Sequence, residues 1–196
     1  MVSPEQLIAF TERVAQAFEA KQIPSPVHLN SASQAEHLIR IFQDVKPEDW
    51  VFSTWRSAWH CLLKGWPEEE LFQEILKGHS MHLTSEKYRV LCSSIVGGHL
   101  PIASGVAAGI QRRGGSEQVW CFVGDMAACS GLFSETARYC SAKRLPIRLV
   151  IEDNGFSTDT PTWQAWGVCS QIVENVSQYS YERNLPHVGT GKFVRF

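Results

Sequence analysis

Two short polar motifs follow apolar segments in the second half of the sequence. Gly124-Asp125 comes after "EQVWCFV", and Asp153-Asn154 comes after "LPIRLVIE". Carboxylate and amide oxygens are hard donors that suit Mg²⁺ or Ca²⁺ when a phosphate and water complete the coordination shell. Both motifs are also ordinary turn sequences. The residue types alone therefore allow either a metal-phosphate site or two unrelated turns.

The segment between the motifs favours the metal-phosphate site. It holds the amphipathic stretch "GLFSETARYCSAKR" and then the apolar run that leads to Asp153. Nearly continuous apolar strands joined by a helix imply a parallel sheet covered on both faces. Ligands of such sheets lie outside the carboxyl ends of the strands. The loop before a helix near Gly131 can present N–H groups to an anion, so we expect a metal-diphosphate site at this edge.

Elements elsewhere in the chain complete an α/β domain. Ser3 is a suitable N-cap and Pro4 a suitable first residue for an amphipathic helix. Small and polar residues make 78–99 a long loop, a kind of segment that is often functional. The other expected elements are a helix over about 33–43, a strand in "DWVFSTW", a helical turn from Arg56 to Gly65, a helix from Pro67 to Gly78, a helix from Pro101 to Gly114, a polar helix-like stretch after Trp166, and an edge strand in "HVGTGKFVRF".

Composition limits the class of protein. A chain of 196 residues with 44% apolar content can form one sizeable core, so we expect a single domain over residues 1–196. A formal net charge of −2 argues against nucleic-acid and membrane-surface partners. The sequence contains no apolar run of the roughly 18 residues that a membrane span needs. Six cysteines without a CxxC pair and an N-terminus without a signal peptide predict a reduced, cytoplasmic setting.

The motifs resemble those of a known family: the α subunits, or diphosphate-binding domains, of thiamine diphosphate enzymes of the 2-oxo acid dehydrogenase E1 type. The family motif is GDG, a spacer and NN, and Gly124-Asp125-Met126 with Asp153-Asn154 is similar to it. The similarity extends from about residue 28 to 162. It implies the thiamine diphosphate-binding fold, a three-layer α/β domain with a central parallel sheet flanked by helices. The other matching segments are "FSTWRSAWHCLLKG", "LKGHSMHL", "SIVGGHLPIASGVAAG" and "RLPIRLVIEDNGFSTDTPT".

The resemblance also implies ligands for thiamine diphosphate and Mg²⁺. Asp125, Asn154 and the backbone carbonyl of Phe156 would bind the metal. Arg56 would hold the diphosphate, which its planar fork suits; a surface ion pair is the alternative for this residue. The expected cofactor-binding set is Trp55, Arg56, Ser94, Val96, Gly124, Asp125, Met126, Ala127 and Asn154, and the candidate catalytic residues are His28 and His82, each of which is also explained as a satisfied loop histidine.

The sequence departs from the family pattern at several positions. Met126 replaces the second glycine of GDG, so that its side chain must point away from the diphosphate. Asp153 replaces the first asparagine and adds a charge near the metal, though not on it. Cys129-Ser130 replace two other residues that are common in the family. Ala58 replaces a common histidine, and the missing imidazole indicates a substrate other than pyruvate.

The family resemblance implies a two-subunit enzyme that acts on a small carbonyl compound. The reaction would be 2-oxo acid decarboxylation with acyl transfer, or ketol transfer on a sugar-like substrate. In this family the glutamate that activates the cofactor belongs to a β-type pyrimidine-binding subunit, and Glu135 is better explained as a structural or interface acid. We therefore expect an α-type subunit in an α2β2-like assembly. The alternative is a non-catalytic paralogue, a binding or regulatory subunit that lost productive geometry through Met126 and Ala58.

Overall fold

A central six-stranded sheet organises the computed structural model, which describes residues 2–167 and 175–192. The strand order is β2-β3-β1-β4-β5-β8. All neighbouring strands are parallel except β2, which runs antiparallel to β3. The predicted α/β class with a central parallel sheet is confirmed. The strands are β1 (Trp50–Ser53), β2 (Thr84–Ser85), β3 (Val90–Cys92), β4 (Val119–Gly124), β5 (Ile147–Asp153) and β8 (Val176–Ser180).

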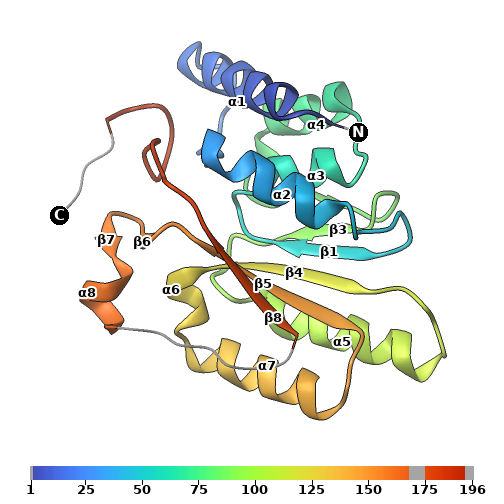
Figure 1. Ribbon diagram of the computed structural model, residues 1–196. Coiled ribbons are helices and arrows are strands. Elements are labelled where there is room, and N and C mark those ends of the chain that lie inside the picture. Colours follow the sequence, from blue (N-terminus) through green and yellow to red (C-terminus); the bar gives the residue numbers. More distant parts are fainter. Residues whose placement is uncertain (1, 168–174, 193–196) are drawn as a thin grey trace.

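Helices cover both faces of this sheet, as Figure 1 shows. Helices α1 to α4 lie on one side, and α5 and α7 lie on the other. A two-stranded hairpin of β6 (Phe156–Ser157) and β7 (Thr160–Pro161) follows β5. In the described residues no helix is long and apolar enough to cross a membrane. The helices are α1 (Pro4–Glu19), α2 (Ala35–Phe42), α3 (Ala58–Leu63), α4 (Glu68–Glu74), α5 (His99–Arg112), α6 (Asp125–Ala128), α7 (Gly131–Ala142) and α8 (Thr162–Trp166), with a short 3-10 helix (Ala32–Gln34) before α2 and a π-helix (Ile75–His79) after α4.

The strands are apolar on both faces because each face has its own core. Val51, Phe122 and Val150 pack into the core under α1 to α4. Their strand neighbours Phe52 and Val123 pack into the second core, which includes the buried side chains of α5 and α7. A strand buried on both faces shows a continuous apolar run instead of an alternating pattern. This is why "EQVWCFV" and "LPIRLVIE" were recognisable as buried strands.

The first helix begins as its sequence predicts. Gln6 N–H donates to Ser3 Oγ at 3.3 Å, and Ser3 N–H donates to Gln6 Oε1 at 2.8 Å, which completes a capping box. Pro4 occupies the first helical position, where its missing N–H costs no hydrogen bond. The helices predicted at about 33–43, from Pro67 and from Pro101 are also present as α2, α4 and α5.

Three predictions for the connecting segments need correction or fall outside the described residues. Segment 78–99 is not one loop, because it contains β2 and β3, and β3 pairs with β1. The edge strand is β8 and not "HVGTGKFVRF": residues 187–192 contain no strand, and 193–196 lie outside the described residues. The prediction of a polar helix-like stretch after Trp166 is wrong at Val176–Ser180, which form strand β8, while its residues 168–174 also lie outside the described residues. Strands β2 and β3 have two and three residues, which is too few to show the alternating apolar and polar pattern that predicts a strand.

Candidate cofactor site

A pocket opens where the parallel strands of the sheet end. It holds about 710 Å³ of empty space, part of which is open to solvent. The chain places β3 and β4 on opposite sides of β1, so the strand order reverses at this point. Ligands of open α/β sheets lie at such a switch point. The lining residues follow five strands: Thr54, Trp55 and Arg56 after β1; Ile95, Val96 and Gly97 after β3; Val123, Gly124, Asp125, Met126 and Ala127 at the end of β4; Glu152, Asn154, Phe156, Ser157 and Thr158 at the end of β5; and Tyr181, Arg183 and His187 after β8.

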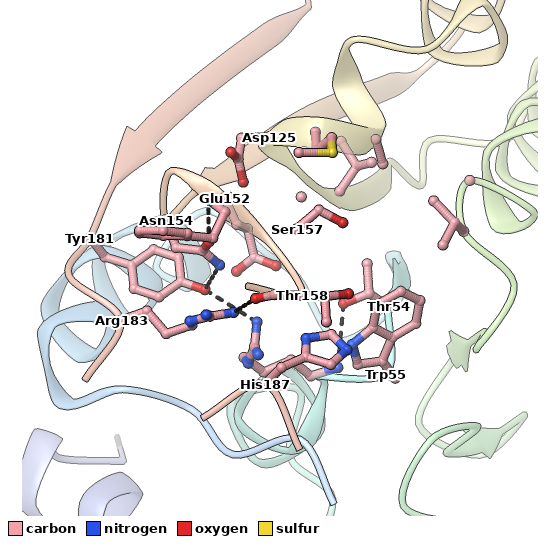
Figure 2. A pocket seen from close by; sticks show the side chains of 18 of the residues that line it. Thr54, Trp55, Asp125, Glu152, Asn154, Ser157, Thr158, Tyr181, Arg183 and His187 are labelled. Carbon is pink, nitrogen blue, oxygen red and sulfur yellow. Dashed lines mark hydrogen bonds between the residues drawn. The ribbon is translucent and has the colours of Figure 1, made fainter. Parts of the chain in front are cut away.

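The three predicted metal ligands meet in this pocket, and Figure 2 shows two of their side chains, Asp125 and Asn154. Asp125 begins α6 and is only 8% exposed, and this burial raises the pKa of its carboxyl group. Thr162 donates a hydrogen bond to Asp125 Oδ2. Asn154 Oδ1 accepts a hydrogen bond from the backbone N–H of Phe156 at 2.9 Å. This bond fixes the amide orientation, since a backbone N–H can only donate.

The donor set fits a Mg²⁺ ion whose other coordination positions are filled by phosphate oxygens and water. The Asp153 side chain does not line this pocket; its carboxylate accepts hydrogen bonds from Gly155 N–H at 2.9 Å and from Gln178 Nε2 at 2.8 Å. Within the described residues no three His, Cys, Asp or Glu side chains gather into a metal site. One carboxylate, one amide oxygen and one backbone carbonyl are sufficient for Mg²⁺, which completes its octahedron with phosphate oxygens and water.

Arg56 is a partly buried cationic residue that forms no ion pair with the described residues. Its Nε donates to the Leu29 carbonyl at 3.0 Å, while Nη2 is buried and has no hydrogen-bond partner within the described part of the chain. A buried N–H without a partner costs free energy, and a charged one costs more. A Cβ added to Gly124 would meet no other atom within 4 Å, so protein packing does not require glycine there. Both observations fit a diphosphate in the pocket.

The other predicted site residues divide into two groups. Trp55, Val96, Met126 and Ala127 line the pocket together with the residues above. Ser94 is exposed and does not line it. The candidate catalytic histidines do not line the pocket either. His82 is exposed beside His79, while His28 packs behind the pocket wall against Trp55 and His187, with ring centroids 5.5 and 4.9 Å away.

Glu152 lines the pocket and was missed by the sequence prediction. It is 5% exposed, and its Oε1 accepts hydrogen bonds from Tyr179 Oη at 2.5 Å and from Gln34 Nε2 at 3.3 Å. His60 Nε2 lies 3.3 Å from the same oxygen but forms no hydrogen bond with the described residues. An acid inside the apolar run "LVIED" was the signal that could have identified this residue.

The segment after β8 forms a further wall of the pocket that the sequence did not indicate. It contributes Tyr181, Arg183 and His187, which Figure 2 labels. Arg183 is 4% exposed and donates to the Thr158 carbonyl and to Asp159 Oδ1, the latter at 2.9 Å. Burial, followed by the charge of Arg56, lowers the pKa of His187. The pocket therefore combines two arginines with a neutral imidazole.

Burial of His28 predicts an acid-sensitive fold. Burial, and then electrostatic interactions with Arg56 and His187, lower the pKa of His28 to about 3, whereas an unfolded histidine titrates near 6.5. The unfolded chain therefore binds the proton first. Protonation of His28 therefore does not reduce the free energy of unfolding above pH ~6.5. Below that pH it lowers the free energy of unfolding by up to about 1.4 kcal/mol per pH unit, until the pH reaches the folded pKa.

We expect His28→Gln to flatten the pH dependence of stability, measured by urea unfolding between about pH 4 and pH 6.5. His82→Gln is the matched control, because that side chain is exposed. Equal slopes for wild type and His28→Gln would show that His28 is not held neutral by burial.

Comparison with known proteins agrees with this geometry. A family model described as "Dehydrogenase E1 component" matches residues 5–177. The alpha subunit of acetoin:2,6-dichlorophenolindophenol oxidoreductase from Bacillus subtilis is 28% identical over 193 residues, which cover 93% of this chain and 56% of the relative. Its Cupriavidus necator counterpart is 31% identical over 161 residues, covering 77% of this chain and 48% of the relative.

A third relative has a different name. The pyruvate dehydrogenase E1 component subunit alpha of Rickettsia prowazekii is 26% identical over 170 residues, covering 82% of this chain and 52% of the relative. The chain thus spans about half the length of the curated relatives that it matches. The family model covers most of the chain, as the resemblance of its motifs predicted. The chain therefore belongs to the dehydrogenase E1 component family.

Proposed function

We propose that this chain is an α-type subunit that binds thiamine diphosphate and Mg²⁺ at the carboxyl edge of its sheet. One observation carries the proposal: the Asp125 carboxylate, the Asn154 amide and the Arg56 guanidinium, whose Nη2 has no hydrogen-bond partner among the described residues, belong to a single pocket. The bound cofactor would supply a nucleophilic carbanion that attacks a carbonyl carbon. Family membership supports the same cofactor.

Each group has a defined task in this proposal. Asp125, Asn154 and the Phe156 carbonyl would hold Mg²⁺, which would offset the negative charge of the diphosphate. Arg56 would bind them with its planar fork. The first N–H groups of α6 have no partner within the helix, which leaves the backbone of Met126 and Ala127 able to donate to the same anion.

The substrate class follows from the cofactor and is supported by the relatives' names. Two relatives are named for acetoin and one for pyruvate dehydrogenase, and both acetoin and pyruvate are small carbonyl compounds. We propose a small carbonyl substrate for this chain as well. Two reactions meet this description: 2-oxo acid decarboxylation with acyl transfer, and ketol transfer.

We also propose that the site is completed by a β-type, pyrimidine-binding subunit in an α2β2-like assembly. The relatives are named as alpha subunits, which supports a second kind of subunit. Ile95 and Val96 line the pocket but are 71% and 61% exposed, and Trp163 on α8 is 71% exposed. Large exposed apolar side chains of this kind are typical of interaction surfaces.

A non-catalytic binding or regulatory subunit is the second candidate function. The observations that favour it are Met126 in the pocket wall and Ala58 at the first turn of α3, where the family motif has a glycine and a histidine, respectively. Such a subunit would bind the cofactor but would not support its activation in any assembly.

Calorimetric titration with thiamine diphosphate tests the proposed function. We expect saturable binding in the presence of Mg²⁺ and its loss when the metal is chelated. An absence of binding at millimolar cofactor, or binding that is unaffected by the chelator, would contradict the proposal.

Arg56→Lys should weaken cofactor binding although it keeps the positive charge. A lysine ammonium is a point charge and cannot form the two parallel hydrogen bonds of a guanidinium fork. We expect a loss of roughly 1–3 kcal/mol, the scale of a hydrogen bond to a charged group, measured by the same titration. Arg112→Lys, at the far end of α5, should match the wild type. An affinity of Arg56→Lys within about twofold of the wild type would mean that Arg56 does not contact the diphosphate.

A further inference from the structure

Tyr181 follows β8 and lies between the two proposed ligand groups of the pocket. Its hydroxyl oxygen accepts a hydrogen bond from Asn154 Nδ2 at 2.9 Å and a weaker one from Arg56 Nη1 at 3.5 Å. Figure 2 shows the Tyr181 ring beside Asn154, with its hydroxyl group directed toward the centre of the pocket. The hydroxyl therefore joins the proposed metal ligand to the proposed diphosphate ligand.

The hydroxyl proton of Tyr181 is not used by the protein. In both hydrogen bonds the phenol oxygen is the acceptor, because Arg56 and the fixed Nδ2 of Asn154 can only donate. No acceptor for the proton lies within hydrogen-bonding distance in residues 2–167 and 175–192. Tyr181 is 8% exposed and lines the pocket, so its hydroxyl can donate a hydrogen bond to a ligand in the pocket.

The segment that carries Tyr181 is fixed at several points. Tyr181 N–H donates to the Asp153 carbonyl at 2.9 Å, which extends the pairing of β5 with β8. The Glu182 carbonyl accepts a hydrogen bond from Ser33 Oγ at 2.7 Å, and Gly189 N–H donates to the Val27 carbonyl at 2.8 Å. The hydroxyl is consequently placed before any ligand arrives, and such preorganisation favours binding.

We propose that Tyr181 is an additional anion-binding residue, whose hydroxyl donates a hydrogen bond to a phosphate oxygen of the diphosphate held beside Arg56. This inference rests on the proposed function, since it assigns a further ligand to the same bound group. A tyrosine phenol carries its proton at neutral pH and can donate it in a hydrogen bond. Accepting two hydrogen bonds from Asn154 and Arg56 also polarises the hydroxyl and makes it a stronger donor.

The test is calorimetric titration of Tyr181→Phe with two probes, thiamine diphosphate and inorganic pyrophosphate, at saturating Mg²⁺. We expect about tenfold weaker binding of both probes, as for the loss of one hydrogen bond to a charged group. Tyr179→Phe is the matched control, because Tyr179 does not line the pocket and its hydroxyl contacts Glu152 and Gln34, neither of which is assigned to the diphosphate, so its loss should leave both affinities unchanged.

Two further measurements separate direct contact from an effect through the neighbours. If Tyr181 acted only by orienting Asn154, Tyr181→Phe would lose affinity at limiting Mg²⁺ but would bind both probes with wild-type affinity at saturating Mg²⁺. If it acted only through Arg56, Tyr181→Phe would have no effect in the Arg56→Lys background. Either result, or wild-type affinity in Tyr181→Phe itself, overturns the inference, whereas a loss that persists in both conditions supports it.

The same experiment distinguishes this inference from the proposed function. A wild-type chain that binds neither probe contradicts the proposed function, whereas wild-type binding that Tyr181→Phe leaves intact contradicts only the role of Tyr181. Should the variant not fold, as judged by its thermal transition, 3-fluorotyrosine at position 181 in the otherwise native chain replaces it. Its ¹⁹F resonance should shift on addition of pyrophosphate with Mg²⁺, and an unchanged resonance would count against the contact.

Discussion

Asp125→Ala should abolish Mg²⁺-dependent binding of thiamine diphosphate. Asp125 is the one carboxylate among the proposed metal ligands, so its removal takes away the charge that holds the cation against the diphosphate. Loss of a group that only supports a metal ligand already costs about 10–100-fold in affinity. We therefore expect a loss of more than about 100-fold for the ligand itself, measured by calorimetry with saturating Mg²⁺.

The fold should survive this substitution. Asp125 is buried, and its burial already disfavours the charged form, so an alanine there removes a desolvation cost together with the hydrogen bond from Thr162. Asp153→Asn is the matched control, because the Asp153 side chain is directed to Gly155 and Gln178 and does not line the pocket. Wild-type affinity in Asp125→Ala, or an equal loss of affinity in Asp153→Asn, would contradict the assignment of Asp125 as a metal ligand.

Exchange of the cofactor C2 proton should be slow in this chain alone and fast after a β-type partner is added. The exchange reports cofactor activation without knowledge of the substrate. The acids that line the described pocket are Asp125, assigned to the metal, and Glu152, which is engaged by Tyr179 and Gln34. Neither is placed to act as a free activating acid, and a pocket open to water leaves a carbanion unprotected.

The measurement is ¹H NMR of C2 exchange into deuterated buffer, with the chain alone, the partner alone and the mixture. We expect an increase of at least about 100-fold on mixing, equal to ~2.7 kcal/mol of barrier, together with a shift to a larger assembly in size measurements. Glu152→Gln tests whether Glu152 is the activating acid. Fast exchange in the isolated chain that Glu152→Gln abolishes would place the activating acid in this chain. A mixture that assembles but never exchanges rapidly would favour the non-catalytic subunit.

The sequence by itself determined the central part of this architecture. The apolar runs before Gly124 and Asp153, and the amphipathic helix between them, identify β4, α7 and β5. Parallel strands joined by a helix must end at the same edge of a sheet. The sequence alone therefore predicts that Asp125 and Asn154 lie close together. Local chemistry also determined the start of α1, because the capping box involves residues only three apart in the chain.

Only the tertiary structure decided the remaining walls of the pocket. Glu152 is positioned by Gln34, which is 118 residues away in the chain, and Tyr181 reaches Asn154 across 27 residues. Strand β3 has three residues, and β8 is an edge strand of polar composition, so neither has a periodicity that would reveal its pairing. The register between β5 and β8 then determines which side chains of the following segment enter the pocket. Pairing of distant strands depends on which surfaces pack together in the whole fold, and that information is absent from any short stretch of sequence.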